Sequence, residues 1–316
     1  MTLSVLLTLI AAFLVSGAAT GALIPLLIRM QVVDTPNARS SHSAPVPRGG
    51  GLGILLGLAA GLAVAAIAHR PLPAQAILAG AAAVAAVSFV DDSRAGGLAI
   101  RWRLLAQTLA AVWVAVQCGP LPRVPLPAPL DLPLAVFALP ATVLWIVAVT
   151  NIYNFLDGID GYAAVQGLLA GLTLALFDPA AFAAVGLALA GGCAGFLLHN
   201  WHPARIFMGD TGSATLGFLI AALPLMLPEP SRAPAVFVVI LALWFFLSDG
   251  VFTLLRRAYD GERFWEPHRT HLYQLLVRAG LRHHQVVTRI AVPAAALCAL
   301  AALSVRFEQV GFCWTT

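Results

Sequence analysis

Side chains that bind metal ions and phosphates are concentrated in five short segments of this chain. Carboxylate and amide oxygens are ligands for hard cations such as Mg²⁺, whereas arginine and histidine donate charge-assisted hydrogen bonds to phosphate. The polar residues concerned are Arg39, His42 and Arg48; Asp91 and Asp92; Asn151, Asn154, Asp157 and Asp160; Asn200 and Asp210; and His268, Arg269 and His271. Together these residue types predict metal-assisted chemistry on phosphate groups.

Asp91 and Asp92 are adjacent at the end of a long apolar run. Two neighbouring carboxylates repel each other, and at the edge of a membrane helix this repulsion requires a cation or a basic partner. The simpler alternative is a solvated helix end that is neutralised by Arg94. Because acids at such positions are functional by default, the pair is a candidate part of the site.

The segment 151–161 has a polar residue at every third position. Three helical residues turn the face back by about 60°, so the four polar side chains cannot share one face, although neighbouring pairs such as Asp157 and Asp160 can. Gly158 and Gly161 weaken a helix, which predicts a broken helix with side chains that converge on Mg²⁺ or Mn²⁺. A turn that simply contains Asp and Gly is the alternative.

Asp210 lies between glycines at the start of another apolar run, where a carboxylate can cap a helix or bind a metal ion. The presence of the other acids favours the metal ion. His268 and His271 are three residues apart, with Arg269 between them, and this spacing suits contacts to a diphosphate. A solvated loop is the alternative for this segment, and it is the interpretation preferred for residues 283–284.

The rest of the chain supplies the elements that must position these residues. Of its 316 residues, 60% are hydrophobic and only 10% are charged, and the mean hydropathy is +0.89. A soluble domain carries about 25% charged residues, so residues 1–316 are predicted to form a single all-α integral membrane domain. About ten transmembrane helices are expected, near 3–27, 51–68, 74–90, 104–117, 132–150, 160–177, 180–198, 213–228, 234–255 and 286–304.

The distribution of arginines indicates how these helices are oriented. All 18 basic residues are arginine, and if the helices alternate, fourteen lie on the side that carries the polar segments. The positive-inside rule makes that side cytoplasmic. The net charge of +4 therefore reflects topology and anion binding, and no nucleic acid is expected as a partner.

Three of the segments resemble the signature loops of the polyprenyl-phosphate N-acetylhexosamine-1-phosphate transferase family. They are Asp91-Asp92, Asn151-x-x-Asn154-x-x-Asp157-Gly-x-Asp160-Gly161 and Phe207-x-Gly-Asp210-x-Gly-Ser213. The resemblance covers nearly the whole chain, from the segment 34–53 to His271. It implies a multi-pass enzyme of the bacterial inner membrane, with its active site on cytoplasmic loops. Such an enzyme transfers a sugar phosphate from a UDP-N-acetylhexosamine to undecaprenyl phosphate and releases UMP.

The resemblance also implies roles for individual residues. Asp210 and Asp157 would hold Mg²⁺, or Mn²⁺ as an alternative, and Asp91 or Asp92 would position the acceptor or take a residual proton. Asn200, Asp160 and Phe207 would help to seat the uridine. His268 and His271 are expected to be catalytic, through contacts to phosphate or sugar. The remaining substrate contacts are expected from Arg39, His42, Arg48, Asn151, Asn154 and Arg269.

The expected mechanism is direct displacement at the β-phosphorus of the donor. The second pKa of a phosphate monoester is near 6, so the acceptor is mostly a dianion at pH 7 and needs no strong general base. Neutralising the charge of two anions is then the main task. The competing view makes Asp157 a covalent nucleophile.

The segment His268-Arg269-Thr270-His271 bears on the choice of substrate. It resembles the branch that initiates lipopolysaccharide O-antigen with UDP-GlcNAc or a 6-deoxy sugar such as FucNAc or QuiNAc. The translocase of phospho-MurNAc-pentapeptide, which carries three consecutive histidines there, is the alternative. A secondary transporter is a rival of a different class, but it would place ionisable residues near the bilayer midplane. Membrane lipid and a second copy of the chain, as a homodimer, are the other expected partners.

Overall fold

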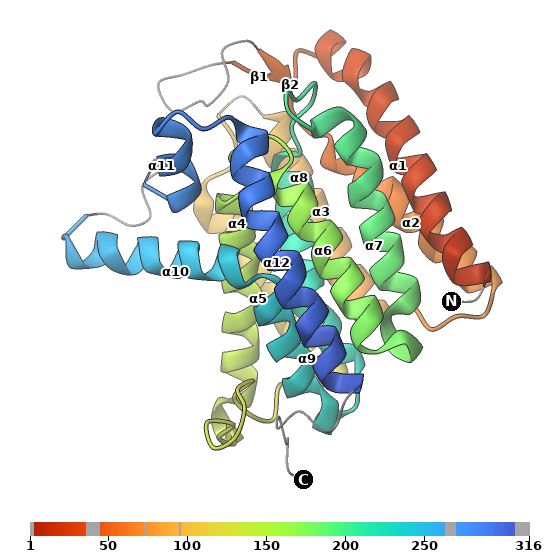
Figure 1. The fold of residues 1–316 in the computed structure, drawn as a ribbon, viewed down its shortest axis with the longest axis vertical. Helices are drawn as coiled ribbons and strands as arrows, with labels where there is room; N and C mark the ends of the chain where they lie inside the picture. Colours follow the sequence, from red (N-terminus) through yellow and green to blue (C-terminus); the bar gives the residue numbers. More distant parts are fainter. Residues whose placement is uncertain (1–2, 36–44, 73, 95, 263–269, 307–316) are drawn as a thin grey trace.

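The computed structural model describes residues 3–35, 45–72, 74–94, 96–262 and 270–306, with side chains up to residue 302. The chain is almost entirely helical (Figure 1). Its helices are α1 Leu3–Arg29, α2 Gly51–Ile67, α3 Gln75–Ser93, α4 Ile100–Cys118, α5 Ala138–Phe155, α6 Tyr162–Phe177, α7 Pro179–Asn200, α8 Gly209–Ala222, α9 Glu229–Ala242, α10 Trp244–Tyr259, α11 Leu272–Arg278 and α12 His283–Arg306. Short 3-10 turns, η1 Ala135–Phe137 and η2 Leu223–Met226, precede α5 and follow α8. The one pair of strands is β1 Val33–Asp34 with β2 Val46–Pro47 in the described part of the chain.

The predicted all-helical class is confirmed, and helices of the structure coincide with each predicted apolar run. Five helices are long and apolar enough to cross a membrane, namely α1, α3, α5 with η1, α7 and α12. The pair α9 and α10 makes up to six if it counts as one span. The number of ten spans therefore stays a prediction.

The run 234–255 was expected to be one span, and the structure shows two helices there instead of one continuous helix. The run divides at Leu243, and α9 and α10 meet at an angle of 78°. In Figure 1, α10 lies across the direction of the other long helices. Mean hydropathy over a window does not indicate the angle between two consecutive helical segments. It also cannot predict the long-range contacts of Asp249 in α10 with the start of α11, which are described below.

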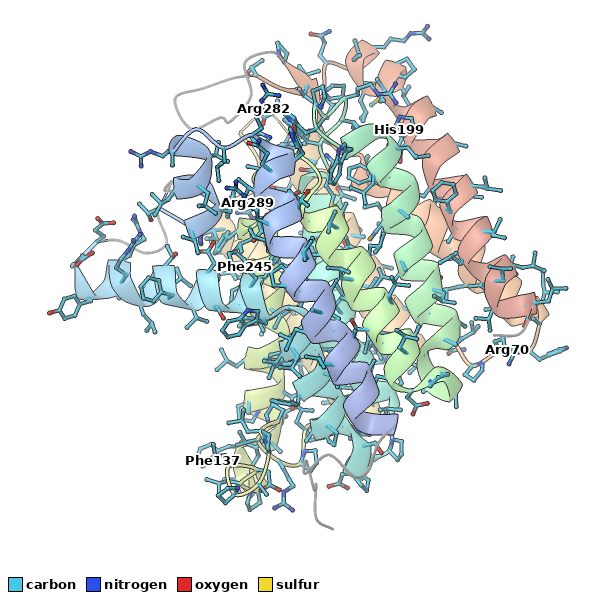
Figure 2. The ribbon with its side chains drawn as sticks, viewed as in Figure 1. Arg70, Phe137, His199, Phe245, Arg282 and Arg289 are labelled. Atoms are coloured by element: carbon cyan, nitrogen blue, oxygen red, sulfur yellow. The ribbon has the colours of Figure 1, made fainter. Side chains whose placement is uncertain are left out.

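The helices alternate in direction, so that one end of the bundle collects the polar segments that the structure describes (Figure 1). The carboxyl ends of α1, α3, α5 and α7 lie at this end, together with the amino ends of α2, α4, α6, α8 and α12. Arg282 lies at this polar end and Arg70 at the opposite end (Figure 2). The predicted convergence on one side is thus confirmed for the polar segments within the described residues.

Helix α8 lies inside the bundle, and every residue from Thr211 to Ala222 is buried. Its sequence is apolar or small on all sides, which is typical of a helix that is enclosed by others. The amino end of α2 approaches α8 so closely that a Cβ atom on Gly51 would lie 2.3 Å from Cα of Gly212. Glycines at both positions therefore allow the amino ends of α2 and α8 to pack in direct backbone contact at the polar end.

Gly51→Ala should destabilise the protein by roughly 1–3 kcal/mol, because the added methyl group meets backbone that cannot move aside. We expect a lower midpoint of thermal unfolding in detergent and a matching loss of activity from displacement of α8. Leu56→Ala, which shortens an exposed side chain of the same helix, is the matched control. An unchanged midpoint in Gly51→Ala would show that the α2–α8 contact is looser than it appears in the structure.

Candidate active site

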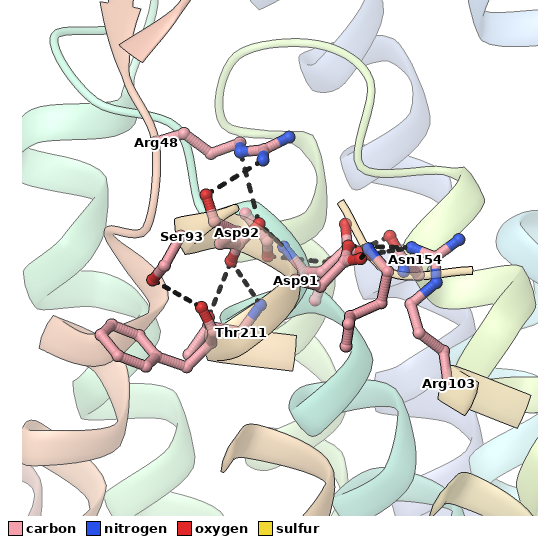
Figure 3. Close-up of polar contacts among 12 residues, drawn as sticks. Arg48, Asp91, Asp92, Ser93, Arg103, Asn154 and Thr211 are labelled. Atoms are coloured by element: carbon pink, nitrogen blue, oxygen red, sulfur yellow. Dashed lines mark hydrogen bonds and ion pairs between the residues drawn. The ribbon is translucent and has the colours of Figure 1, made fainter. Parts of the chain in front are cut away.

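Three carboxylates, from Asp91, Asp92 and Asp210, form the centre of the polar end. One oxygen from each lies within 4.8 Å of the others. Asp91 and Asp92 are in the last turn of α3 (Figure 3). Asp210 is in the first turn of α8. Because Asp91 and Asp92 are buried, their repulsion is weakly screened and requires nearby positive charge.

Arg103 in α4 supplies part of that charge. Its Nη1 lies 3.1 Å from Oδ2 of Asp91 and also forms an ion pair with Asp210 (Figure 3). From the sequence, Arg103 was expected only among the arginines that set the topology, in a loop that ends before the next apolar run. Its carboxylate partners come from two other helices, so no local spacing could reveal it.

Both carboxylate oxygens of Asp92 accept hydrogen bonds from the amino end of α8. Its Oδ1 accepts a hydrogen bond from the backbone N–H of Asp210 at 3.1 Å, and its Oδ2 accepts from the N–H and hydroxyl of Thr211 at 2.9 and 2.7 Å. Nε of Arg48 lies 3.3 Å from Oδ1 of Asp92, and Nη2 of Arg48 donates to the Asp92 carbonyl at 3.2 Å. Asp92 thus caps α8 from a neighbouring helix and fixes the place of Asp210.

The segment that carries Arg48 is itself joined to the segment before α8. Phe207 N–H donates to the Pro47 carbonyl at 2.8 Å, and Gly50 N–H donates to the Phe207 carbonyl at 2.9 Å. These bonds place Arg48 and Phe207 side by side at the polar end. Both predicted residues therefore belong to the same site.

The turn between α5 and α6 brings Asp157 to the carboxylate group. Helix α5 ends at Phe155 and α6 begins at Tyr162, so the predicted break in 151–161 is confirmed. Burial, followed by the negative charges of Asp210, Asp92 and Asp160, raises the pKa of Asp157 to about 7. A group with that pKa can hold either a proton or a cation near neutral pH.

The amides of α5 extend the site along one helix. Asn154 hydrogen-bonds to Asp210 and accepts from the Ser213 hydroxyl at 3.2 Å. Asn151, one turn earlier, donates to Oε1 of Gln107 at 2.6 Å and to its own helix. Asn154 is thus part of the carboxylate site, whereas Asn151 mainly ties α5 to α4.

A second polar group lies around Asp160, at the end of the same turn. The Nδ1 atoms of His202 and His283 lie 2.6 and 3.2 Å from its Oδ2. His283 was expected to be solvated, and this expectation is wrong, because the side chain is buried at the first residue of α12. Asn200 accepts from the N–H of Gly161 at 2.9 Å and donates to the Ile206 carbonyl at 2.9 Å, so both ends of its amide are engaged.

His271 lies on the α10 side of the site and is buried. Its Nδ1 is 3.3 Å from Oδ1 of Asp249, which also accepts from the N–H of Leu272 at 2.9 Å. This pairing of α10 with α11 joins residues 22 and 23 apart in the sequence, and no local spacing predicts it. The predicted residues Arg39, His42, His268 and Arg269 lie outside the described residues.

The donor atoms at the carboxylate centre fit a hard divalent cation. Asp91, Asp92, Asp210 and the nearby Asp157 offer only oxygen, which suits Mg²⁺ or Mn²⁺ better than zinc. Arg48 and Arg103 carry two positive charges against the four negative charges that these acids carry when ionised. The remaining negative charge favours a cation at this place.

Comparison with known proteins agrees with this geometry. The profile of glycosyl transferase family 4 matches residues 74–228, which include Asp91, Asp92, Asp157 and Asp210. The chain is also 30% identical over 292 residues to a probable undecaprenyl-phosphate N-acetylglucosaminyl 1-phosphate transferase of Bacillus subtilis (strain 168), covering 89% of this chain and 81% of the relative. The chain belongs to glycosyl transferase family 4.

Other relatives within the family carry two different descriptions. A decaprenyl-phosphate N-acetylglucosaminephosphotransferase of Mycobacterium leprae is 29% identical, covering 88% of this chain and 78% of the relative. A phospho-N-acetylmuramoyl-pentapeptide-transferase of Synechococcus sp. (strain RCC307) is 36% identical, covering 61% of this chain and 57% of the relative. The family match spans α3 to α8, so the carboxylate centre lies wholly within the part of the chain that defines this glycosyl transferase.

Proposed function

We propose that this glycosyl transferase moves an N-acetylhexosamine-1-phosphate from a UDP-sugar to undecaprenyl phosphate and releases UMP. The observation that carries the proposal is the group of carboxylates from α3, α8 and the α5–α6 turn at one end of an apolar bundle. A water-soluble donor and a lipid-linked acceptor meet only at a membrane surface, and the site lies where such a surface would be. The family relatives named above act on polyprenyl phosphates according to their descriptions, which agrees with this substrate class.

The residues at the carboxylate centre have different proposed roles in this reaction. Asp210 and Asp157, with Asp91, would hold Mg²⁺, which neutralises charge on the diphosphate of the donor. Arg48 and Arg103 lie beside these acids and can bind phosphate oxygens through charge-assisted hydrogen bonds. Asp91 or Asp92 would position the acceptor phosphate or take a residual proton from it.

Direct displacement at phosphorus is the mechanism that we favour. The acceptor phosphate is already mostly a dianion at pH 7, so positioning and charge neutralisation suffice. In the competing mechanism Asp157 attacks first and carries the sugar phosphate covalently. Isolation of a phosphosugar on Asp157, or stereochemical evidence for two displacements, would decide for that mechanism.

The proposed pathway is the initiation of lipopolysaccharide O-antigen or a related envelope glycan at the cytoplasmic face of the bacterial inner membrane. The His268-Arg269-Thr270-His271 sequence supports this branch, and GlcNAc, FucNAc and QuiNAc are the candidate sugars. Transfer of phospho-MurNAc-pentapeptide is the second candidate, because relatives with that description also match the chain. The two candidates share the same chemistry and differ in the donor.

Release of UMP from a panel of UDP-sugars tests the proposal. Purified full-length protein would be supplied with undecaprenyl phosphate and Mg²⁺, and each candidate UDP-N-acetylhexosamine and UDP-MurNAc-pentapeptide would be a separate arm. We expect UMP from one UDP-N-acetylhexosamine and none when undecaprenyl phosphate is omitted. UMP from the pentapeptide donor alone would select the second candidate. No UMP from any donor, together with solute uptake into liposomes, would support a transporter instead.

The raised pKa of Asp157 gives the site a testable pH dependence. The folded protein without metal keeps a proton on Asp157 up to about pH 7, whereas the unfolded chain releases it above about pH 4. The contribution of this group to stability therefore falls as the pH rises from about 4 to 7, and it is constant above that range. Because Mg²⁺ requires the ionised carboxylate, it competes with this proton.

We expect the Mg²⁺ concentration for half-maximal thermal stabilisation to fall about tenfold between pH 6 and pH 8, since the ionised fraction of a group with a pKa near 7 rises about tenfold. Asp157→Asn should remove most of this dependence, and the remainder comes from Asp210, whose pKa burial raises to about 6. Asp178→Asn, at the cap of α7 on the opposite end of the bundle, is the control that should keep it. Equal Mg²⁺ midpoints for the wild-type protein at both pH values would exclude Asp157 as the titrating ligand.

A further inference from the structure

Helix α10 holds the start of α11 by contacts on both sides of His271. Oδ1 of Asp249 accepts a hydrogen bond from the N–H of Leu272 at 2.9 Å. Nη2 of Arg256, in the same helix, donates to the carbonyl of Thr270 at 2.8 Å. Because His271 lies between these two anchored residues, α10 fixes the backbone before and after it.

The carboxylate of Asp249 has a fixed orientation within α10. It is buried, and the hydroxyl of Thr253, one turn later, donates to its Oδ1 at 3.0 Å. Residues 249, 253 and 256 are four and three positions apart, so they lie on one face of the helix. A buried carboxylate needs hydrogen bonds in place of water, and most of those of Asp249 come from the segment that carries His271. Nδ1 of His271 itself lies 3.3 Å from Oδ1 of Asp249.

The same segment packs against the turn that carries Asp157. The N–H of Tyr273 donates to Oδ2 of Asp249 at 3.4 Å, and the Tyr273 hydroxyl donates to the Phe155 carbonyl, at the end of α5, also at 3.4 Å. A Cβ atom on Gly158 would overlap this hydroxyl. Because Asp157 lies between Phe155 and Gly158 in the chain, the start of α11 packs directly beside the carboxylate centre.

The first turn of α11 also has a local cap of its own. Oε1 of Gln274 accepts a hydrogen bond from the backbone N–H of His271 at 3.2 Å, as in a capping box. This bond closes the turn without any contribution from α10. The contacts from Asp249 and Arg256 therefore determine where the turn lies relative to the carboxylate centre.

We infer that Asp249 and Arg256 are positioning residues that act through His271, which they hold in place to contact the diphosphate of the donor. The inference rests on the proposed function, which supplies a nucleotide diphosphate. An imidazole N–H hydrogen-bonds to a phosphate oxygen only when its ring is correctly placed. A displacement of about 1 Å by a change far from the reacting atoms can cost a hundredfold in rate, so the support of His271 matters as much as the side chain itself.

A double-mutant cycle on the dissociation constant of UDP tests the inference. UDP carries the diphosphate that every candidate donor shares, and it would be bound to the full-length protein with Mg²⁺ present. Asparagine has one acceptor oxygen where aspartate has two, so we expect Asp249→Asn to weaken UDP about tenfold. With His271→Ala already present, the same change should weaken UDP by less than about twofold, because the side chain that Asp249 positions is gone.

Variants of Arg256 test the same inference from the other side of His271. Arg256→Ala removes the donor to the Thr270 carbonyl and should also weaken UDP about tenfold, but only while His271 is present. Arg256→Lys keeps a donor and should bind UDP nearly as tightly as the wild-type protein. Asp260→Asn, at an exposed position just beyond α10, is the matched control and should leave UDP binding unchanged.

The outcomes distinguish this inference from the proposed function. Equal weakening of UDP by Asp249→Asn with and without His271 would overturn the inference, because Asp249 would then act on the structure in general. It would also be overturned if His271→Ala bound UDP as tightly as the wild-type protein, or if thermal unfolding in detergent showed neither Asp249→Asn nor Arg256→Ala to be folded. These results leave the proposed function intact while the wild-type protein releases UMP. Failure of the wild-type protein to bind UDP and to release UMP from any donor would overturn both.

Discussion

Asp210→Asn should lower the rate of UMP release by at least about a thousandfold while the protein remains folded. Asp210 contributes a carboxylate to the centre of the site, and the amide of asparagine is uncharged and a weaker ligand for Mg²⁺. Loss of preorganised charge stabilisation in an enclosed site costs several kcal/mol, and each 1.36 kcal/mol changes the rate tenfold. The measurement is UMP release at saturating donor, acceptor and Mg²⁺.

The control for this variant is Asp131→Asn, which removes the same charge from the opposite end of the bundle. Asp131 pairs with Arg123 in the loop between α4 and α5, at 3.1 Å, and should leave the rate unchanged. Raising the Mg²⁺ concentration is a second test, because a ligand variant weakens metal binding as well as turnover. A folded Asp210→Asn protein with activity within tenfold of wild type would exclude Asp210 as a metal ligand.

The convergence of the polar segments on one end could be predicted because it depends only on hydropathy and alternation. Apolar runs must cross the bilayer, so the residues between them alternate between two sides. Asp91, Asp157 and Asp210 therefore fall on one side whatever the packing. The broken helix at 151–161 was equally accessible, since Gly158 and Gly161 act locally.

The partners of these residues could not be predicted, because they depend on packing between distant helices. Arg103 reaches Asp210 across 107 residues, and His283 reaches Asp160 across 123 residues. The residues around His283 in the sequence do not indicate whether its side chain is buried or solvated. The hydrogen bond from the Leu272 N–H to Asp249 in α10 likewise joins residues 23 apart in the sequence.

Asp91 and Asp92 are adjacent in the sequence, but in the structure their carboxylates have different partners. Asp91 accepts from the N–H of Leu98 and pairs with Arg103, on the side of the loop before α4. Asp92 faces α8 and binds its first backbone N–H groups. Gly209 has a φ of 73°, and a Cβ atom there would lie 2.6 Å from Oδ2 of Asp92, so glycine is required where α8 turns toward this carboxylate.

Asp92→Ala should therefore act on the fold as well as on activity. It leaves the N–H groups of Asp210 and Thr211 without their acceptor and Arg48 without its partner, which together predict a loss of roughly 3–5 kcal/mol in the free energy of unfolding. The measurement is the unfolding midpoint in detergent, together with UMP release. Displacement of the amino end of α8 would move Asp210, so activity should be lost in the same variant.

Asp92→Asn distinguishes a cap from a catalytic group. Its single amide oxygen can still accept from one of the two α8 N–H groups, so we expect a smaller stability loss than in Asp92→Ala and measurable activity, in contrast to Asp210→Asn. The ion pair with Arg48 is lost in both Asp92 variants, so Arg48→Ala measures that part separately. If Asp92→Asn were as stable as wild type and as inactive as Asp210→Asn, Asp92 would have to act directly on the metal ion or the substrate.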